Sequence, residues 1–391
     1  MDETDRLFTC GYCRVKSYLV QNDYFRYMLP NATPEDEKLI FFPYWRFKGM
    51  LFSCVSDGIR HRFMDVSYQA VESRYFPESV GLRSQALKLK FVTPESPGRF
   101  LKPTLSIEEV MHLFMERFRS SLPKPVFLQS HIGETLSLIY SPFRVDKKII
   151  DGVLNKPTPA KLPDDFDVTL LPGGRPDWHI RFMPTLCPGC GWDMHGERDA
   201  LVLNCRNCNS AWRPGKNGFK RLKFAHMPGK DKNMIFLPFW RFRVDASGIV
   251  LDSYADLVRV ANLPRAIQDD WHDMGFFFWT LGFKVSPQIF ISLARKITLS
   301  QPKAKPSSEM PNGKLFPVTL PVEEAFESLK INLASFMKPR VTLFPKLEDI
   351  TIKSKNILLM YIPFNEKHNE LVQPDLNIAI SKNQLAMAKN L

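Results

Sequence analysis

Several kinds of sequence feature are scarce or missing in this chain. No apolar run reaches the ~18 residues that a membrane-spanning helix needs, and the first residues are acidic and polar, unlike a signal peptide. Cysteine is also scarce, with seven in 391 residues. Six of the seven form three Cys-x-x-Cys pairs, a spacing typical of metal sites in a reducing compartment. We therefore expect an unexported protein of the cytoplasm.

The common catalytic and nucleotide-binding motifs are missing too. The sequence has no Gly-x-Ser-x-Gly elbow, no phosphate-binding Gly-x-x-x-x-Gly-Lys-Ser/Thr loop, no Gly-x-Gly-x-x-Gly motif and no His-x-x-x-His pair. Its eight histidines are scattered and have no aspartate or cysteine at a suggestive spacing. The sequence therefore favours a protein that is not an enzyme. An enzyme with a site between two parts of the chain is the third hypothesis.

Aromatic residues and proline, by contrast, are abundant. The chain contains 31 Phe and 31 Pro, whereas its 44% hydrophobic and 24% charged residues are ordinary for a globular protein. This pairing favours strands and turns around aromatic cores. The net charge of +12 favours an acidic partner, such as nucleic acid or anionic lipid headgroups, but the charge alone does not identify one.

Two stretches far apart in the chain read almost alike. Residues 40–47 are IFFPYWRF and residues 235–242 are IFLPFWRF, a shift of 195 positions that also places Cys10 and Cys13 onto Cys205 and Cys208. Further pairs follow in the same order at shifts of 201, 215 and 221, namely Gly81 with Gly282, residues 104–109 with 319–324, and residues 139–143 with 360–364. The sequence therefore predicts a tandem duplication, with insertions in loops of the second copy.

The repeat defines the expected domains. We expect a first unit at residues 1–155, a linker rich in proline at 156–180, and a second unit at 181–391. Capping-box spacing at Ser106 and Glu109, followed by apolar residues at helical spacing, predicts a packed helix in the first unit. Its counterpart should begin near Val322. The expected fold class is α+β, with a mainly antiparallel sheet and one such helix in each unit.

The repeated strand is aromatic on both sides. Alternation places Phe41, Trp45 and Phe47 on one face and Phe42, Tyr44 and Arg46 on the other. A platform for stacking nucleic-acid bases would leave one face open. We favour a strand that is covered on both faces, with its arginine paired to a buried carboxylate, because both copies carry the same residues.

The strongest chemical signal is a set of four cysteines. Cys187 and Cys190 are followed after 14 residues by Cys205 and Cys208, and each two-residue gap lets two thiolates point into one tetrahedron. Residues 187–208 resemble the zinc-ribbon superfamily. The resemblance implies that the four cysteines hold one structural zinc ion in a closed ribbon at residues 184–212. Iron in a rubredoxin-like site and disulfide exchange are the competing interpretations.

Cys10 and Cys13 match only the second half of such a ribbon. By the repeat, their missing partners would lie upstream of the first residue of the sequence. A start further upstream, or decay of the first ribbon, is favoured over thiolates supplied by another chain. Cys54 and His61 are substitute ligands that no spacing supports. A second zinc ion is expected only if this half-site is completed.

The segment after the second cysteine pair is unusually basic. Residues 206–232 carry eight Lys and Arg but only one acidic residue. The matching residues 11–37 carry more acidic than basic residues. The candidate nucleic-acid contacts are Arg213, Lys216, Lys220, Arg221 and Lys223, with Trp212, Phe219 and Phe224 as rings that could stack on bases. A solvated face over an aromatic core is favoured over this interpretation.

The predicted function is a non-enzymatic, zinc-stabilised scaffold or adaptor that binds another macromolecule. Protein is the expected partner and nucleic acid the alternative. The four-cysteine ribbon followed by an aromatic strand also loosely resembles a group of uncharacterised bacterial ribbon-containing proteins. That resemblance carries no function over to this chain.

Overall fold

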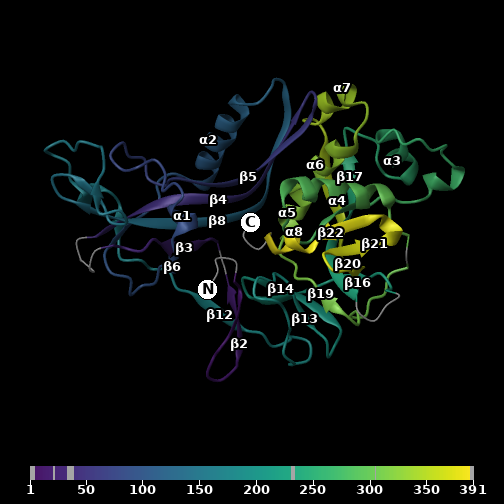
Figure 1. Cartoon of the computed structure of the whole chain (residues 1–391), viewed down its shortest axis with the longest axis horizontal. Coiled ribbons are helices and arrows are strands. Elements are labelled where there is room, and N and C mark those ends of the chain that lie inside the picture. The colour runs from purple at the N-terminus through teal and green to yellow at the C-terminus, as the bar shows by residue number, and fades with distance from the viewer. Residues whose placement is uncertain (1–4, 21–22, 33–38, 230–233, 304, 388–391) are drawn as a thin grey trace.

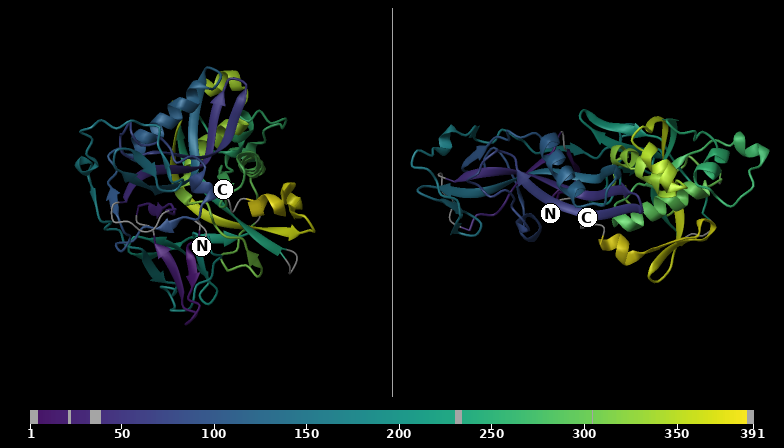
Figure 2. Two further views of the ribbon diagram at one scale, coloured as in Figure 1. Left: turned by 60° about the vertical axis from the view of Figure 1, so that its left-hand side comes forward. Right: turned by 90° about the horizontal axis from the view of Figure 1, so that it is seen from above.

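The computed structural model describes residues 5–20, 23–32, 39–229, 234–303 and 305–387. It consists mostly of β-sheet with several helices, which is compatible with the expected α+β class. Figure 1 shows the first half of the chain in purple and blue beside the second half in green and yellow. In the view from above in Figure 2, the two halves follow one another along the longest axis. Among the described residues, no helix combines the length and apolar character needed to cross a bilayer.

The first half contains a nine-stranded sheet that is mainly antiparallel. Its strands, in the order of their pairing, are β10 (Lys156–Pro157), β9 (Ile149–Asp151), β8 (Val126–Val145), β4 (Ile40–Val55), β7 (Arg99–Leu101) and β11 (Gly173–Gly174). Three further strands lie off this path. β5 (Gly58–Gln69) pairs with β4, and β3 (Phe25–Met28) pairs with both β8 and β6 (Lys90–Phe91). The long strands β4 and β8 therefore lie at the centre of the sheet.

The second half contains a seven-stranded sheet. Its strands, again in the order of their pairing, are β18 (Phe278–Leu281), β17 (Met234–Ser247), β20 (Thr351–Glu366), β21 (Glu370–Gln373) and β22 (Ile378–Ser381). Two short strands pair in parallel with this path, β16 (Phe224–His226) with β20 and β19 (Lys314–Leu315) with β17. The centre of this sheet is again a pair of long antiparallel strands, β17 and β20.

The central strand pairs of the two sheets have corresponding registers. β4 pairs with β8 at Ile40 and Phe143, and β17 pairs with β20 at Ile235 and Phe364. These positions are related by the shifts of 195 and 221 seen in the sequence. The repeated sequence blocks therefore lie side by side in the same way in both sheets.

A tryptophan makes the same hydrogen bond in each half. The indole Nε1 of Trp45 donates to the carbonyl oxygen of Leu105 at 2.9 Å, and that of Trp240 donates to Leu320 at 3.1 Å. Both acceptors lie in the blocks related by the shift of 215. Each bond satisfies a buried polar N–H and ties the aromatic strand to the segment before the next helix.

A short parallel strand packs closely against each aromatic strand. β7 runs parallel to β4 and β19 runs parallel to β17, and a glycine precedes each short strand. A Cβ on Gly98 would lie 2.8 Å from the Phe41 ring, and one on Gly313 would lie 2.7 Å from the Phe236 ring. Neither position accepts a side chain without movement of its neighbours.

The predicted match of Gly81 with Gly282 is wrong. The N–H of Gly282 donates to the carbonyl oxygen of Pro238, and in the first half it is Ala70 that donates to Pro43 in the same way. Gly81 instead lies in an exposed turn, where its φ of +57° accounts for the glycine. The shift at this point of the chain is therefore 212. A shared dipeptide pattern was too short to fix the alignment.

β4 is buried on both faces, as predicted. Phe41, Trp45 and Phe47 lie in a core that is covered by helix α2 (Ile107–Ser120). Phe42 and Tyr44 lie in a second core on the opposite face. Because both faces are filled by side chains of the chain itself, the strand is no open platform for bases.

Helix α2 begins where the sequence predicted. The hydroxyl of Ser106 accepts from the N–H of Glu109, and the Glu109 carboxylate accepts from the N–H of Ser106, so that the capping box is complete. Val110 and Phe114 are buried against the sheet. Such a box satisfies two of the N–H groups that the first turn of a helix leaves without partners.

The arginine of the repeated strand has a different partner in each half. Arg46 pairs with Asp65 at 2.7 Å, and both side chains are almost buried, as predicted. Arg241 lies instead over the rings of Phe277 and Trp279, at 4.6 and 5.7 Å from their centroids. Its burial lowers the pKa of Arg241. The prediction of a carboxylate partner is confirmed for the first half only.

The second half is richer in helices than the sequence suggested. The predicted helix near Val322 is present as α5 (Val322–Glu327), which leads into α6 (Leu329–Phe336). The helices that the sequence did not predict include α3 (Tyr254–Val260) and α4 (Pro287–Ser300). In α4 the buried Phe290, Leu293 and Ile297 follow helical spacing, but its isoleucines and threonine also favour strands. The remaining short helices are α1 (Arg83–Ala86), α7 (Arg340–Leu343) and α8 (Lys382–Met387).

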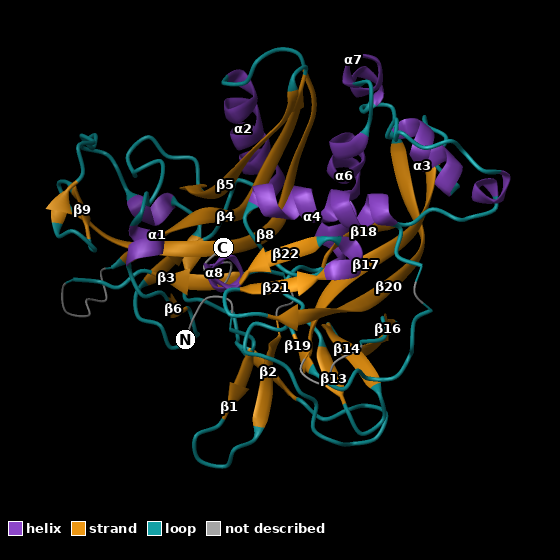
Figure 3. Cartoon of the chain, turned by 45° about the vertical axis from the view of Figure 1, so that its right-hand side comes forward, coloured by secondary structure: helices purple, strands orange, loops and turns teal. Residues whose placement is uncertain are grey.

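The long strands of the first half reach into the second half. Met50, Phe52, Cys54 and Ile132, near the far end of β4 and β8, belong to the same buried core as α4, α5 and α6. The ring centroids of Phe52 and Phe290 are 6.1 Å apart. Figure 3 shows the tip of the β4–β5 hairpin beside α6 and α7. The two halves therefore share a hydrophobic core.

Residues 156–180, which were expected to form a linker, pack against the first sheet. They contribute the edge strands β10 and β11 and a short 3-10 helix, η1 (Val168–Leu170). Leu162, Phe166 and Leu171 pack against the core of the first sheet, and Trp178 packs beside Phe25. This stretch thus joins the two predicted units in sequence while covering the surface of the first.

Two small sheets lie below the large ones in the view of Figure 1. The first contains β1 (Leu7–Thr9), β2 (Lys16–Val20) and β12 (Arg181–Pro184), so that the start of the chain pairs with residues far along it. The second contains β13 (Leu203–Cys205), β14 (Ser210–Gly215) and β15 (Gly218–Leu222). Both are antiparallel throughout.

The shared core can be tested with Phe52. Because the Phe52 ring is fully buried between the two halves, we expect Phe52→Ala to lower the free energy of unfolding by about 3–5 kcal/mol. Chemical denaturation followed by circular dichroism measures this change. Phe63→Ala is the matched control, since Phe63 lies in the same hairpin but is 36% exposed and should cost about 1 kcal/mol. Equal stability of the two variants would contradict a shared core.

Candidate metal centre

Four cysteine side chains converge beside the second small sheet. The Sγ atoms of Cys187, Cys190, Cys205 and Cys208 all lie within 4.8 Å of one another. Cys187 is 3.5 Å from Cys208, and Cys190 is 3.5 Å from Cys205. A disulfide would be about 2.0 Å long, whereas four thiolates around one zinc ion, each bound at about 2.3 Å, are about 3.8 Å apart. The cluster therefore has the spacing of a tetrahedral metal site and can hold one metal ion.

Two backbone turns position these side chains. The first turn carries Cys187 and Cys190 and is closed by hydrogen bonds from Cys187 N–H to the Trp192 carbonyl and from Gly191 N–H to the Cys187 carbonyl, both 2.8 Å. Gly191 has a φ of +74°, a conformation that glycine adopts without strain. The second turn joins β13 to β14, where Cys205 pairs with Ser210.

The thiols differ in their electrostatic surroundings. Burial opposes ionisation of Cys187, but hydrogen bonds from the Gly189 N–H, the Ser210 hydroxyl and the Cys190 N–H outweigh it and lower its pKa to about 6. Burial raises the pKa of Cys205 to about 12. The cluster therefore combines a thiol whose ionisation is favoured by its surroundings with one whose ionisation is opposed. A divalent ion would displace the remaining protons, since metal-bound cysteines are deprotonated.

Ser210 supports the cluster from β14. Its hydroxyl oxygen accepts a hydrogen bond from the indole Nε1 of Trp212 at 2.7 Å, and it lies 3.0 Å from the Sγ of Cys208 and 3.7 Å from that of Cys187. The hydroxyl can donate to one of the two sulfurs. Sequence reasoning missed this residue, although strand alternation places it on the same side as Trp212. Groups of this kind orient metal ligands and tune their basicity.

The cluster lies between the start of the chain and the second half. Its hydrophobic surroundings combine Leu7 and Tyr18 with residues around the cysteines, and the Tyr18 hydroxyl donates to the Ala200 carbonyl at 3.1 Å. On the other side, Val202 belongs to the core of the second half, and the Leu201 N–H donates to the Val318 carbonyl at 2.8 Å. A metal ion here would hold together three parts of the fold.

Cys10 and Cys13 lie apart from this cluster. Both are exposed, in the turn between β1 and β2. Among the residues with described positions, no other histidine, cysteine or acid completes them to a group of three. Cys54 is buried in the shared core, where burial raises the pKa of its thiol to about 12, and His61 is exposed. The suggested pair of substitute ligands is therefore not brought to Cys10 and Cys13.

The basic stretch forms the β14–β15 hairpin and the residues around it. Lys216, Lys220, Arg221 and Lys223 are exposed, whereas Arg213 pairs with Glu323 at 2.7 Å. Positions 230–232 of the stretch lie outside the described residues. The three rings are not available for stacking: Trp212 and Phe224 are buried, and Phe219 packs edge-on against Tyr18 at 5.9 Å. The hairpin thus presents exposed cations over an aromatic core.

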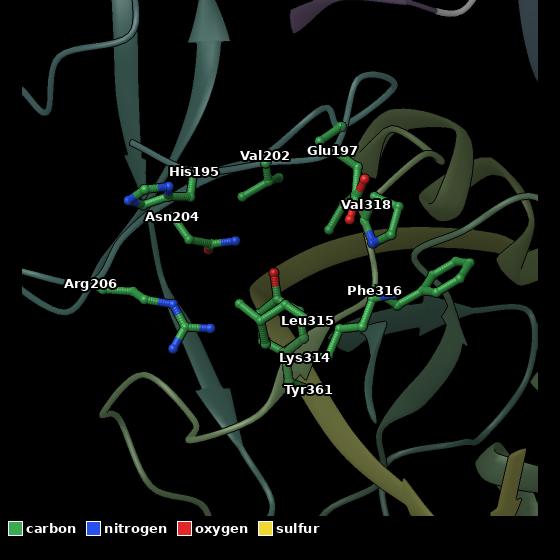
Figure 4. Close-up of a pocket in the computed structure, with 13 residues that line it drawn as sticks. His195, Glu197, Val202, Asn204, Arg206, Lys314, Leu315, Phe316, Val318 and Tyr361 are labelled. Carbon is green, nitrogen blue, oxygen red and sulfur yellow. The ribbon is translucent and has the colours of Figure 1, made fainter. Parts of the chain in front are cut away.

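A cavity of about 220 Å³ lies between the cysteine-rich segment and the second sheet. His195, Asn204, Arg206, Lys314 and Tyr361 are among the residues that line it, and Figure 4 shows the polar ends of Asn204, Arg206 and Tyr361 directed toward it. The Asn204 Oδ1 atom is buried and has no hydrogen-bond partner among the described residues. Pockets for small molecules usually measure about 300–1,000 Å³, so this one suits water or a very small polar ligand. No sequence motif indicated it.

Comparison of the chain with protein-family models, with curated proteins and with solved structures finds no match. The interpretation of the site therefore depends on its own geometry and chemistry.

Metal content tests the cluster directly. We expect Cys205→Ser to lose the metal ion of the cluster and to lower the thermal unfolding midpoint, because structural zinc sites bind with about 10–16 kcal/mol of apparent free energy. Inductively coupled plasma mass spectrometry and thermal scans measure the two effects. Cys54→Ala is the control, since it removes a buried thiol outside the cluster. If Cys205→Ser retained the metal content of the unchanged chain, the four-cysteine site would be refuted.

Proposed function

We propose that this chain is an internally duplicated scaffold, stabilised by one zinc ion, that binds another protein. The four-cysteine cluster supports zinc because its sulfur spacing fits a tetrahedral thiolate site and two of its cysteines are buried. Four thiolates leave no open position for a water molecule or substrate. The ion is therefore structural, and the segment around it is a zinc ribbon.

The duplication is supported by pairing, hydrogen bonding and close approach together. The registers of β4 with β8 and of β17 with β20 correspond, and so do the hydrogen bonds of Trp45 and Trp240 and the positions of Gly98 and Gly313. An unrelated pair of sheets would have no reason to share all three. On this reading, the basic hairpin and the complete metal centre are what distinguish the second copy.

One observation favours a protein partner. Thirteen large hydrophobic side chains are exposed among the described residues, and five of them gather in the short segments 12–15 and 182–192: Tyr12, Val15, Phe182, Leu186 and Trp192. These segments are neighbours, since β12 pairs with β2 and the Thr185 N–H donates to the Lys16 carbonyl. Exposed apolar groups that cluster in this way are typical of protein interaction sites. We call these five residues the apolar edge.

The apolar edge can be tested by polar substitution. We expect the triple variant Phe182→Ser, Leu186→Ser and Trp192→Ser to lose at least one protein that the unchanged chain enriches, by about tenfold or more, because exposed aromatic anchors often contribute about 2 kcal/mol each. Affinity purification from nuclease-treated lysate with quantitative mass spectrometry measures this. Leu82→Ser with Val250→Ser, exposed elsewhere, is the control. Identical enrichment by all three chains would argue against a protein partner at this edge.

Nucleic acid is the second candidate partner, and the exposed cations of the β14–β15 hairpin support it. Four cations between residues 216 and 223 are free to approach phosphates, while the rings beneath them belong to the core. Such a surface would bind the phosphate backbone without reading bases.

The nucleic-acid interpretation predicts a strong dependence on salt and on charge. We expect Lys220→Glu, Arg221→Glu and Lys223→Glu together to abolish retention on heparin and binding to duplex DNA at low salt, whereas Lys353→Glu with Lys355→Glu, which are exposed on β20, should leave both unchanged. Fluorescence anisotropy at several salt concentrations measures the binding. If the unchanged chain binds neither heparin nor DNA at low salt, this alternative is refuted.

A further inference from the structure

Cys10 and Cys13 sit in a turn with the same backbone fold as the two turns of the metal centre. In each turn the residue after the second cysteine has a positive φ: 58° at Arg14, 74° at Gly191 and 49° at Asn209. A side chain as large as that of arginine rarely adopts this conformation. The turn at the start of the chain has therefore kept the backbone of a metal-binding knuckle.

The hydrogen bonds of this turn match as well. The Arg14 N–H donates to the Cys10 carbonyl at 2.9 Å, and the Cys10 N–H donates to the Val15 carbonyl at 2.9 Å. These repeat the two bonds, both 2.8 Å, that close the turn of Cys187. The N–H groups of Cys13 and Tyr12 also point at the Cys10 sulfur and lower the pKa of its thiol. The N–H groups at the same two positions act on Cys187.

A tetrahedral thiolate site needs four cysteine ligands, and this knuckle carries two cysteines. Both of its cysteines are exposed, and within the described part of the chain nothing completes them. The cluster at Cys187 already contains four sulfurs of its own, so none of them is available as a ligand at Cys10 and Cys13. Two further ligands for such a site would therefore come from outside the described residues. A second copy of the chain carries the same two cysteines in the same geometry.

We propose that Cys10 and Cys13 bind a second zinc ion that is shared with Cys10 and Cys13 of a second copy, which joins two chains around a four-cysteine site. A two-fold axis through the ion would make both halves of the site identical, as in most homodimers. This deepens the proposed function because it identifies one protein partner, and it uses the same zinc chemistry that we propose for the ribbon.

The charge and surface of the knuckle suit such a site. Zinc with four thiolates carries a net charge of −2, and each copy brings Arg14 and Lys16 next to its cysteines. Tyr12 is 99% exposed and Val15 54% exposed, so contact between copies would cover apolar surface at the same place. Assembly forms four Zn–S bonds and breaks four S–H bonds, and the four protons pass to the solvent. No electron transfer is involved.

Zinc stoichiometry and molar mass together test this proposal on the full chain. We expect about 1.5 zinc ions per chain, one in the ribbon and half of a shared ion, and a dimer by light scattering. Cys10→Ser with Cys13→Ser should give about 1.0 zinc ion per chain and a monomer, with an unchanged circular dichroism spectrum. Both cysteines are exposed, so the fold should tolerate the change. Leu82→Ser, exposed and remote in sequence, should remain dimeric.

Other outcomes would overturn the proposal. About 2.0 zinc ions in a monomer would mean that the chain completes the knuckle itself, and about 1.0 in a monomer would mean that the knuckle holds no zinc. A dimer that persists in the double variant would have another interface. Failure of this proposal can be distinguished from failure of the proposed function. If the proposed function holds, the double variant keeps the zinc ion of the ribbon. Cobalt(II) in place of zinc supplies a second readout, since tetrahedral thiolate coordination gives a visible spectrum that should weaken by one third in the double variant.

Discussion

The ladder of backbone hydrogen bonds between an aromatic strand and its long antiparallel neighbour is the constraint on which each half depends. It places Trp45 and Trp240 where their indoles reach the segment before the next helix. It also brings a short parallel strand so close that glycine must precede it. Because β4 carries aromatic side chains on both faces, both faces must be covered by other elements. The helix on one side and the folded segment 156–180 on the other meet that demand.

The second constraint is the four-cysteine cluster, which lies beside the two small sheets, where the hydrophobic cores are small. The two small sheets bury few large side chains of their own, and the cysteines lie among those that they do bury. Small sheets of this kind usually need a metal or disulfides to remain folded. In this chain the thiols also lie where the first strands, the cysteine-rich segment and the second sheet meet. A structural ion at that point would influence the stability of all three.

The sequence was most informative where residues repeat or where spacing is dictated by chemistry. The aromatic strand, the capping box at Ser106 and the convergence of four cysteines could all be predicted. What could not be predicted depends on contacts between distant residues. Nothing local indicates that β2 pairs with β12, that Phe52 enters a core built by the other half, or that Arg241 stacks on rings in place of a carboxylate. The missed helix α4 had helical spacing, but its β-branched residues obscured the pattern.

The pairing of β2 with β12 has a consequence for how the chain folds during synthesis. The last residue of β2 leaves the ribosome about 160 residues before the first residue of β12, which corresponds to roughly 8–32 seconds of translation. Through that interval the hairpin of Cys10 and Cys13 lacks its third strand, while the first large sheet is being completed. The first small sheet can therefore be completed only after every strand of the first large sheet has been synthesised. A metal ion at the four-cysteine cluster would bind later still, since all four cysteines follow β12 in the chain.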